Sequence, residues 1–556
     1  MRKLNRNNSN SLSEFHIIML SHLGISLPLL LLGGCGSKEK LKVYDGLISS
    51  YIPPQSVYSP PEQVDQNFDL LNVAENEPYW VASLEMENSE EVIKALLEEH
   101  ENSFTYVFPK GRPNYEMPSI SGWSPASSEM QTASRQIFSS LNNVLDIQFV
   151  ESDSIDQFNA IAISSSFQTA TSGFSYFPNK SYEIGSDVFI AIGYSSPIFI
   201  SDTLTNYDYE VLVHEIGHAL GLKHPFAPDR SNTSILNTFE DNTVLTAMSY
   251  NDSSESFSGL FRPLDLMTLT KFYGVNKSYN NGDNVYEFSE NSGVFIIDGS
   301  GADTIQAENI KQDLYLDLRE GAHSHVGSKS EHISSALQLT ISHGTQIENA
   351  ICGSGNDIVI CNNSSNIIST NFGDDKIYLG AGADKINSGA GNDIIDFSEF
   401  NQEIDTLIID ASSLTVGSDL IYGFTLGSDG DIIDLTGIVD DPVSLLPVIS
   451  SEMIPAGFIT NHILRLVDEE LNSSLQLEAV LNQGSKYANL RFSENSSIFI
   501  ISSPSIDTGH DQYLFKVDVS DSVFEASQLA TFYGNYLDID NWSLDNFLSP
   551  NLEVLV

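Results

Sequence analysis

The sequence predicts an α+β domain, then an all-β parallel β-roll, then a β-sandwich C-terminal region. Residues 89–276 mix helical and strand periodicities, which is typical of an α+β domain. Residues 353–397 repeat a glycine- and aspartate-rich pattern in steps of nine, the pattern of a parallel β-roll. Beyond Asp396, short stretches alternate apolar and polar side chains, as strands of a sandwich do. At 556 residues, of which 41% are hydrophobic, the chain is long enough for two or three cores.

Changes in composition divide the chain into five segments. They are a lipoprotein-type signal peptide (1–35), a polar tether or propeptide (36–85), the α+β domain (86–276), the β-roll domain (277–400), and a β-rich C-terminal domain with a candidate export signal (401–556).

The N-terminal segment has the pattern of a bacterial lipoprotein signal. Basic residues precede the apolar run 27–32, and Gly33 and Gly34 lead into Cys35, which would be lipidated and become the mature N-terminus. The apolar run is too short to span a bilayer, so a lipid on Cys35 would be the only contact with a membrane. An incidental hydrophobic stretch is the alternative.

Periodicity places the first elements of the α+β domain in chain order. We predict a helix over 89–99 and strands over 104–108, 147–150 and 160–163. An amphipathic helix that backs the sheet is predicted from apolar residues at helical spacing: Met130, Ala133, Ile137, Leu141 and Val144.

Three histidines and one glutamate stand at the spacing of a catalytic zinc site. On a helix His214 and His218 lie about 40° apart on one face, so both reach one ion. Gly221 lets the backbone turn so that His224 becomes the third ligand. Three neutral imidazoles leave zinc one open position and lower the pKa of a bound water to about 7. Glu215, about 100° round the helix from His214, then suits the role of general base.

A second motif follows at the expected distance. Met248 stands where a hydrophobic floor under the zinc is needed, and Tyr250 follows it by two positions. The spacing His-Glu-x-x-His-x-x-Gly-x-x-His followed by such a Met-turn is the metzincin signature. Chance histidines and a degenerate, inactive site are the alternatives to a working zinc centre.

These motifs closely resemble the serralysin-type metalloproteases, secreted zinc endopeptidases with a calcium-binding repeat domain. The resemblance rests on residues 214–225, on Met-Ser-Tyr at 248–250 and on Phe-Tyr-Gly-Val-Asn at 272–276. It implies an α+β metzincin catalytic domain with a closing helix within 262–276. It also implies that Tyr250 is a further zinc ligand that swings away to stabilise the oxyanion. A core tyrosine is the alternative for Tyr250.

The resemblance also suggests where substrate binds and how the chain is exported. Residues 173–178 fall where the family has an edge strand that would hold an extended peptide, although aromatic core packing explains the same residues. The last residues, 553–556, resemble the family's export motif of one acidic and three apolar residues. Such a C-terminal export signal conflicts with the N-terminal signal, which family members typically do not carry.

The repeats predict structural calcium sites. Aspartates and turn carbonyls supply hard oxygen ligands, and the apolar residue of each repeat fills the core. Two repeats make one turn, so a calcium ion should bridge Asp357 with Asp375, and Asp375 with Asp393. The repeat containing Asn366 is degenerate, so the site that it shares with Asp384 should be weaker or empty. The expected calcium ligands are Gly353, Gly355, Asp357, Gly373, Asp375, Gly380, Gly382, Asp384, Gly389, Gly391 and Asp393. Residues 299–303 suggest an outlying site, and a glycine-rich solenoid without calcium is the alternative.

Charge and cysteine content exclude several classes of protein. The formal charge of −50 argues against nucleic acid and anionic membranes as partners, because both would repel the chain. No cysteine lies between residues 36 and 351, which excludes a disulfide framework for the catalytic region and a cysteine-switch latency mechanism. Cys352 and Cys361 should stand too far apart for a bridge and remain free thiols.

The predicted function is that of an exported zinc endopeptidase. It would act as a monomer on protein or peptide substrates, with one catalytic Zn²⁺ and several structural Ca²⁺ ions, outside the cell or at the bacterial cell surface as an outer-membrane lipoprotein. Astacin-type and matrix-type metzincins lack the nonapeptide repeats. The rival from another class is a non-catalytic, calcium-dependent adhesin or scaffold whose zinc domain has decayed.

Overall fold

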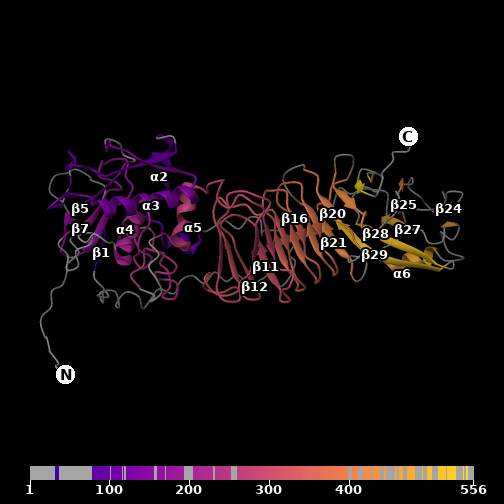
Figure 1. The fold of residues 1–556 in the computed structure, drawn as a ribbon. Coiled ribbons are helices and arrows are strands. Elements are labelled where there is room, and N and C mark those ends of the chain that lie inside the picture. Colours follow the sequence, from indigo (N-terminus) through magenta and orange to yellow (C-terminus); the bar gives the residue numbers. More distant parts are fainter. Residues whose placement is uncertain are drawn as a thin grey trace, which may run out of the picture.

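The computed structural model shows an α+β part followed by an elongated stack of short strands (Figure 1). It describes residues 32–36, 78–99, 102–115, 117, 120–155, 160–169, 171–192, 205–229, 232–251, 260–398, 403–410, 417–426, 430–438, 444–445, 458–459, 462–467, 473–481, 491–492, 497–503, 511–520, 523–533, 542–543 and 546–548. The predicted leader before residue 32, most of the tether and the terminal motif 553–556 lie outside the described residues. Cys35 falls within a described strand, but its side chain is outside the description.

The first part contains a mixed sheet with the strand order β1-β6-β7-β5-β2-β4, to which β3 is added through β5. Strands β4, β2, β5 and β7 run parallel, whereas β6 pairs antiparallel to β7 and β1 antiparallel to β6. The predicted strands are therefore present. Their bounds are β1 (Leu32–Gly36), β2 (Ser103–Val107), β3 (Ser124–Pro125), β4 (Gln148–Glu151), β5 (Ala160–Phe167), β6 (Thr171–Tyr176) and β7 (Val188–Ile192).

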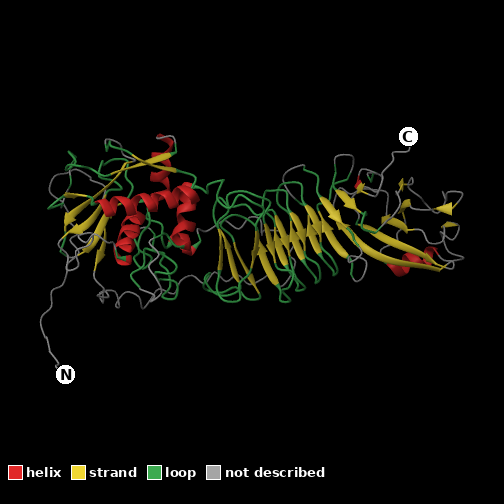
Figure 2. Cartoon of the chain, in the orientation of Figure 1, coloured by secondary structure: helices red, strands yellow, loops and turns green. Residues whose placement is uncertain are grey.

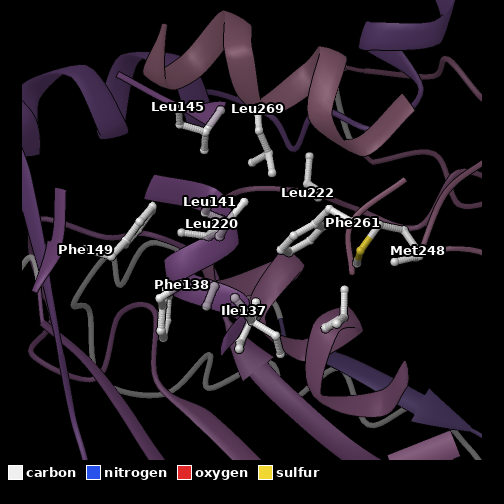
Figure 3. Close-up of a cluster of buried hydrophobic side chains, with 14 of the residues drawn as sticks. Ile137, Phe138, Leu141, Leu145, Phe149, Leu220, Leu222, Met248, Phe261 and Leu269 are labelled. Atoms are coloured by element: carbon white, nitrogen blue, oxygen red, sulfur yellow. The ribbon is translucent and has the colours of Figure 1, made fainter. Parts of the chain in front are cut away.

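Five helices accompany this sheet in the described part of the chain (Figure 2). They are α1 (Tyr79–Ala82), α2 (Ser89–Glu99), α3 (Ser128–Val144), α4 (Asn206–Ala219) and α5 (Pro263–Tyr273). All five apolar residues predicted for the inner face of α3 are buried. They pack with side chains that follow α4, such as Leu220 and Leu222, and with Leu269 of α5 (Figure 3). This apolar cluster fixes α4, which carries the paired histidines, against the rest of the domain.

The folded domain begins before residue 86, earlier than the boundary that the sequence predicts. Trp80, Val81 and Leu84 are all buried and belong to the first hydrophobic cluster. A segment that buries three large apolar side chains is part of a core, because exposing them again would cost roughly 1.5–3 kcal/mol each. The short length of α1 hid it from a search for helical periodicity.

Two facing sheets of short strands form the second part. From β14 to β22 successive strands alternate between the sheets, and from β16 onward each pairs in parallel with the strand two positions earlier, so that Ile358, Lys376 and Ile394 stand in register. Before them, β11, β12 and β13 all lie in one sheet, where β12 is antiparallel to both neighbours. The predicted period of eighteen residues per turn is confirmed. The strands are β8 (Val285–Glu287), β9 (Val294–Ile296), β10 (Thr304–Gln306), β11 (Leu314–Asp317), β12 (His323–Val326), β13 (Gln338–Ile341), β14 (Asn349–Ile351), β15 (Ile358–Ile360), β16 (Ile367–Ser369), β17 (Lys376–Tyr378), β18 (Lys385–Asn387), β19 (Ile394–Asp396), β20 (Thr406–Ile408), β21 (Asp419–Tyr422) and β22 (Ile432–Asp434).

Most of the described C-terminal strands extend the sheets of the roll, so the described residues do not form the separate sandwich that alternation predicts; β24 and β26 pair with each other in a small sheet of their own. Strand β29 pairs in parallel with β21, and β30 pairs with β22. An exposed strand edge offers unpaired backbone groups, and later strands cover it. These elements are β23 (Ser444–Leu445), β24 (Phe458–Ile459), β25 (His462–Val467), α6 (Ser474–Leu481), β26 (Arg491–Phe492), β27 (Ser497–Ser503), β28 (Gln512–Ser520), β29 (Val523–Tyr533) and β30 (Phe547–Leu548).

Two further findings concern cysteines and membranes. Cys352 and Cys361 are buried and free, as predicted. Among the described residues, no helix combines the length and the apolar character needed to cross a bilayer.

Candidate active site

Helix α4 and the turn after it bring the three predicted histidines together. A capping box starts the helix, with the Asp208 amide donating to Thr205 Oγ1 and the Thr205 amide donating to Asp208 Oδ2. His214 and His218 are buried on this helix. Gly221 then takes φ +104°, which residues with a Cβ rarely adopt, and the chain returns His224 to the helix. The predicted roles of helix and glycine in placing the histidines are therefore present in the fold.

The Nε2 atoms of the three rings converge on one point. His224 Nε2 lies 3.1 Å from His214 Nε2 and 3.1 Å from His218 Nε2. The other nitrogens face main-chain carbonyls, with His214 Nδ1 2.8 Å from Ala247 O and His218 Nδ1 2.7 Å from Leu222 O. A carbonyl accepts but cannot donate, so these two Nδ1 atoms carry the protons and their Nε2 lone pairs point inward.

Burial keeps these imidazoles neutral. It lowers the pKa of His214 to about 4, with a small opposing effect from the hydrogen bond to Ala247. Burial also holds the pKa values of His218 and His224 well below the usual range, and the neighbouring histidines lower them further. Neutral imidazole is the form that ligates a metal, so the site is ready for a cation at neutral pH.

The geometry fits a tetrahedral metal ion with one position left open. Zinc–nitrogen bonds of about 2.0–2.1 Å place tetrahedral ligand atoms roughly 3.3 Å apart, close to the observed separations. These three side chains are the one group of at least three potential metal ligands that meets within 4.8 Å in the described part of the chain. The donor set of three imidazoles suits zinc.

Glu215 lies beside the histidines and is held from strand β6. It is fully buried, and Ser175 Oγ lies within hydrogen-bonding distance of its Oε2 at 3.0 Å and of its main-chain oxygen at 2.7 Å. Gly173, two residues earlier on the same face of β6, leaves the space that Glu215 fills. The sequence interpretation missed Ser175, although a glycine and a serine at alternate positions of a strand beside the histidines were the available signal.

Met248, predicted to be the floor under the site, lies against helix α4. It is fully buried, and a Cβ added at Gly217 of α4 would fall 2.5 Å from its sulfur atom. The turn 246–250, which we call the Met-turn, is held by a residue that sequence reasoning missed. Asp265 of α5 accepts hydrogen bonds from the Ala247 amide at 2.8 Å and from Thr246 Oγ1 at 2.6 Å. Asp265 thereby fixes the carbonyl of Ala247, which in turn orients His214.

Tyr250 reaches the site from the end of the Met-turn. Its hydroxyl lies 2.9 Å from His224 Nε2, and its ring contacts the ring of Phe226, with centroids 4.9 Å apart. Tyr250 is half-buried, so it lines the site and is not a core tyrosine. The hydroxyl is near the convergence point of the histidines, where it can donate to an oxygen.

Strand β6, predicted to be an open edge, is covered in this structure. Strand β1 pairs antiparallel to it, with Gly34 opposite Phe174 and Gly36 opposite Thr171. The expectation of an exposed edge was therefore wrong for the full chain, because residues from far upstream complete the ladder. Aromatic packing is present as well, since the rings of Phe174 and Phe189 stack with centroids 5.1 Å apart.

The repeats stack their aspartates in a ladder on the roll. The Asp357 amide donates to Asp375 Oδ1 at 2.7 Å, and the Asp375 amide donates to Asp393 Oδ1 at 2.9 Å. Asp375 Oδ2 and Asp393 Oδ2 are buried and have no hydrogen-bond partner within the described residues. Burial raises the pKa of Asp375 to about 8 and that of Asp393 to about 6. Buried carboxylates with an oxygen left over fit a cation such as calcium.

In the degenerate repeat, the side-chain amide of Asn366 makes the hydrogen bond that holds the turn. Asn366 Nδ2 donates to Glu348 O at 2.9 Å, in the place where other turns offer carboxylates. Its backbone amide still donates to Asp384 Oδ1, at 2.7 Å. At this position the turn therefore presents an NH₂ donor to carbonyl oxygens instead of a carboxylate, and the weaker calcium site stays a prediction.

Comparison with known proteins relates this architecture to one family. Residues 266–441 match the family described as Peptidase M10 serralysin C terminal. The chain is 30% identical over 285 residues to Serralysin of Photorhabdus sp. (strain Az29), covering 46% of this chain and 57% of that protein. It is 29% identical to Serralysin of Proteus mirabilis over 293 residues, and 29% identical to Metallopeptidase AprA of Pseudomonas marginalis over 289 residues. Each of these two matches covers 46% of this chain, and they cover 58% and 59% of the respective relatives.

The chain thus spans somewhat more than half the length of the curated relatives that it matches. The family match covers α5 from residue 266 onward and the roll up to residue 441. The chain is related to the serralysin-type metalloproteases.

Proposed function

We propose that this chain is a zinc-dependent endopeptidase with a metzincin catalytic domain that begins before residue 86 and ends near residue 276. A calcium-stabilised RTX β-roll begins at residue 277, and its sheets continue into the β-rich C-terminal region. The observation that carries the proposal is the convergence of three histidine Nε2 atoms beside the buried Glu215. His224 Nε2 lies 3.1 Å from both His214 Nε2 and His218 Nε2. The kinship with metalloproteases supports it.

In this proposal His214, His218 and His224 hold one zinc ion, with Tyr250 as a further ligand in the resting state. When bound, zinc supplies a Lewis acid that polarises the substrate carbonyl and lowers the pKa of water to about 7. The carbonyl groups of Ala247 and Leu222 keep two of the rings in the tautomer that leaves Nε2 available.

Glu215 acts as the general base. Its carboxylate accepts a proton from the attacking water and later donates it to the leaving amine. Ser175 lies within hydrogen-bonding distance of Glu215 Oε2, and this contact orients the carboxylate toward the histidines. The space at Gly173 lets the carboxylate approach the strand that would hold substrate.

Tyr250 and strand β6 act on the substrate. The Tyr250 hydroxyl, 2.9 Å from His224 Nε2, donates to the carbonyl oxygen as negative charge develops on it. An extended peptide displaces β1 and takes its place on β6 by main-chain hydrogen bonds. The substrates are accordingly unfolded segments of proteins or peptides, which can adopt an extended conformation.

The roll binds several calcium ions, with the aspartate ladder as ligands. The buried Oδ2 atoms of Asp375 and Asp393, which have no other described partner, support this role. Calcium at extracellular concentrations would then stabilise the roll only outside the cell, which agrees with an exported enzyme. We propose an extracellular or cell-surface monomer, with Cys35 as the lipid-bearing residue if the N-terminal signal is used.

The test compares the native chain with Glu215→Ala for cleavage of a denatured protein in the presence of zinc and calcium. The variant should lose on the order of 10² or more in rate and keep its zinc, because Glu215 is not a ligand. A zinc chelator should abolish the native activity. If both proteins bind zinc and neither cuts, even after residues 1–77 are removed, the chain is a calcium-dependent scaffold instead.

A further inference from the structure

One loop of the roll packs against the catalytic domain. Ile333, in the loop 332–334 that follows β12, is buried in the hydrophobic cluster of the first domain. Its amide donates to Tyr79 Oη at 3.2 Å. Gly293 donates its amide to Ser334 O at 2.8 Å and so ties the loop back to the roll beside β9. The loop 332–334 is therefore fixed in both domains at once.

Glu240 of the catalytic domain accepts hydrogen bonds from this loop. It is fully buried, and its Oε1 accepts from the amide and the hydroxyl of Ser334 at 3.1 and 2.8 Å. Its Oε2 accepts from Tyr79 Oη at 2.6 Å and from Asn237 Nδ2 at 2.9 Å. Four neutral groups thus donate hydrogen bonds to the buried Glu240 carboxylate. Because hydrogen bonds to a charged group are stronger than those between neutral groups, these contacts hold the loop firmly.

The next residue, Asp241, accepts hydrogen bonds from side chains at the end of the Met-turn. Its Oδ1 accepts from Ser249 Oγ at 2.6 Å, and its Oδ2 accepts from Asn251 Nδ2 at 2.7 Å. Asn251 Nδ2 also lies 2.8 Å from the main-chain oxygen of Asp241. Asp241 therefore holds both sequence neighbours of Tyr250.

Glu240 and Asp241 belong to one turn, which internal hydrogen bonds hold together. Asn237 Oδ1 accepts from the amides of Phe239 and Glu240 at 2.9 and 3.0 Å, and the Asp241 amide donates to Asn237 O at 2.9 Å. Adjacent Cα atoms lie about 3.8 Å apart across a planar peptide, so a displacement of Glu240 moves Asp241 with it. We call residues 237–241 the interface turn.

We propose that Glu240 and Asp241 are positioning residues, through which the loop 332–334 of the roll sets the location of Tyr250. The inference rests on the role proposed for Tyr250 in catalysis. If these residues position Tyr250, the turnover rate depends on an intact roll, although the described part of the roll contributes no ligand to the zinc site. Loosening the loop should lower kcat more than it raises KM, because Tyr250 acts on the transition state.

A second contact between the domains provides a matched control. Thr270 Oγ1 of α5 lies 2.6 Å from Ser342 Oγ of the roll, and both residues are buried. Neither hydroxyl contacts the interface turn or the Met-turn in any described hydrogen bond. Ser342→Ala thus removes a serine hydroxyl that bonds across the same pair of domains, here to a neutral hydroxyl, without touching Glu240.

The experiment uses the full chain with zinc and calcium. Ser334→Ala and Ser342→Ala are each made in the native and the Tyr250→Phe backgrounds. Ser334→Ala should lower kcat about fivefold to tenfold with KM unchanged, the size expected for the loss of one typical hydrogen bond, because the Ser334 amide still donates to Glu240. In the Tyr250→Phe background the same change should lower kcat less than about twofold, because coupled residues are not additive. Ser342→Ala should act equally in both backgrounds.

Hydrogen exchange gives a readout that needs no activity. Amides of residues 243–251 should exchange faster in Ser334→Ala and at the native rate in Ser342→Ala. Tyr79→Phe, which removes another hydrogen bond to Glu240, is the second variant and should behave like Ser334→Ala. Unchanged exchange in both variants, or an equal loss of kcat in both backgrounds, overturns the coupling. Absence of cleavage by the native chain would instead contradict the proposed function and leave the exchange result as the test.

Discussion

Gly173 and Glu215 lie so close together that no side chain fits between them: a Cβ on Gly173 would stand 2.8 Å from Glu215 Cγ and 2.9 Å from Oε1. The backbone of β6 and the carboxylate of α4 are therefore in direct contact. A substrate strand held by β6 would in this way be placed beside the proposed general base.

Gly173→Ala should lower kcat/KM by on the order of 10², because a displacement of about 1 Å at a catalytic group has that effect. The mechanism is displacement of Glu215 from its hydrogen bond with Ser175. Steady-state cleavage of a peptide substrate measures the loss. Gly111→Ala is the control, since a Cβ there meets nothing within 4 Å. Equal losses in the two variants would show that the contact with Glu215 has no catalytic importance.

Removing residues 1–36 should increase the rate of cleavage of extended peptides. Strand β1 occupies the edge of β6 that we propose binds substrate, and a competing intramolecular strand lowers the apparent affinity. KM should fall in the shortened chain while kcat stays the same. A shortened chain beginning at residue 32, which retains β1, is the control and should behave like the full chain. Identical KM values in all three chains would contradict competition by β1.

Asp375→Asn should weaken calcium binding by the roll and lower its melting temperature at about 1 mM calcium, a concentration typical for extracellular modules. The substitution removes a carboxylate whose Oδ2 is buried without a described partner. Asp374→Asn is the matched control, because Asp374 is the exposed neighbour and its Oδ1 accepts hydrogen bonds that an amide oxygen also accepts. Calorimetric titration with calcium, beside thermal unfolding, separates the two variants.

The metal-free roll should become less stable as pH rises from about 4 to about 8. Burial raises the pKa of Asp375 to about 8 and that of Asp405 to about 7, above the value of about 3.9 in an unfolded chain. The folded state then binds more protons than the unfolded state, and stability is lost as these groups ionise. Thermal unfolding in EGTA at pH 5 and pH 8 measures the effect. Calcium should reverse the trend, because it binds the ionised carboxylates.

The local patterns were readable from sequence because their period is short. The inner face of α3 follows the helical repeat, and all of its predicted residues are buried. The turn at Gly221 follows from the spacing between His218 and His224, which leaves only a few residues for the chain to reverse. The register of the roll follows from glycine and aspartate recurring in each repeat, so that Ile358, Lys376 and Ile394 align.

By itself, the sequence determined the three histidines, the glutamate, the Met-turn and the eighteen-residue turn of the roll, since each depends on residues close together in the chain. Tertiary structure alone decided which distant side chains support them. Ser175 reaches Glu215 across 40 residues, and Ser334 reaches Glu240 across 94. The same holds for the strands that close the roll, where β29 covers β21 in place of a separate sandwich. Such contacts leave no periodic trace, because packing selects them only after both segments have folded.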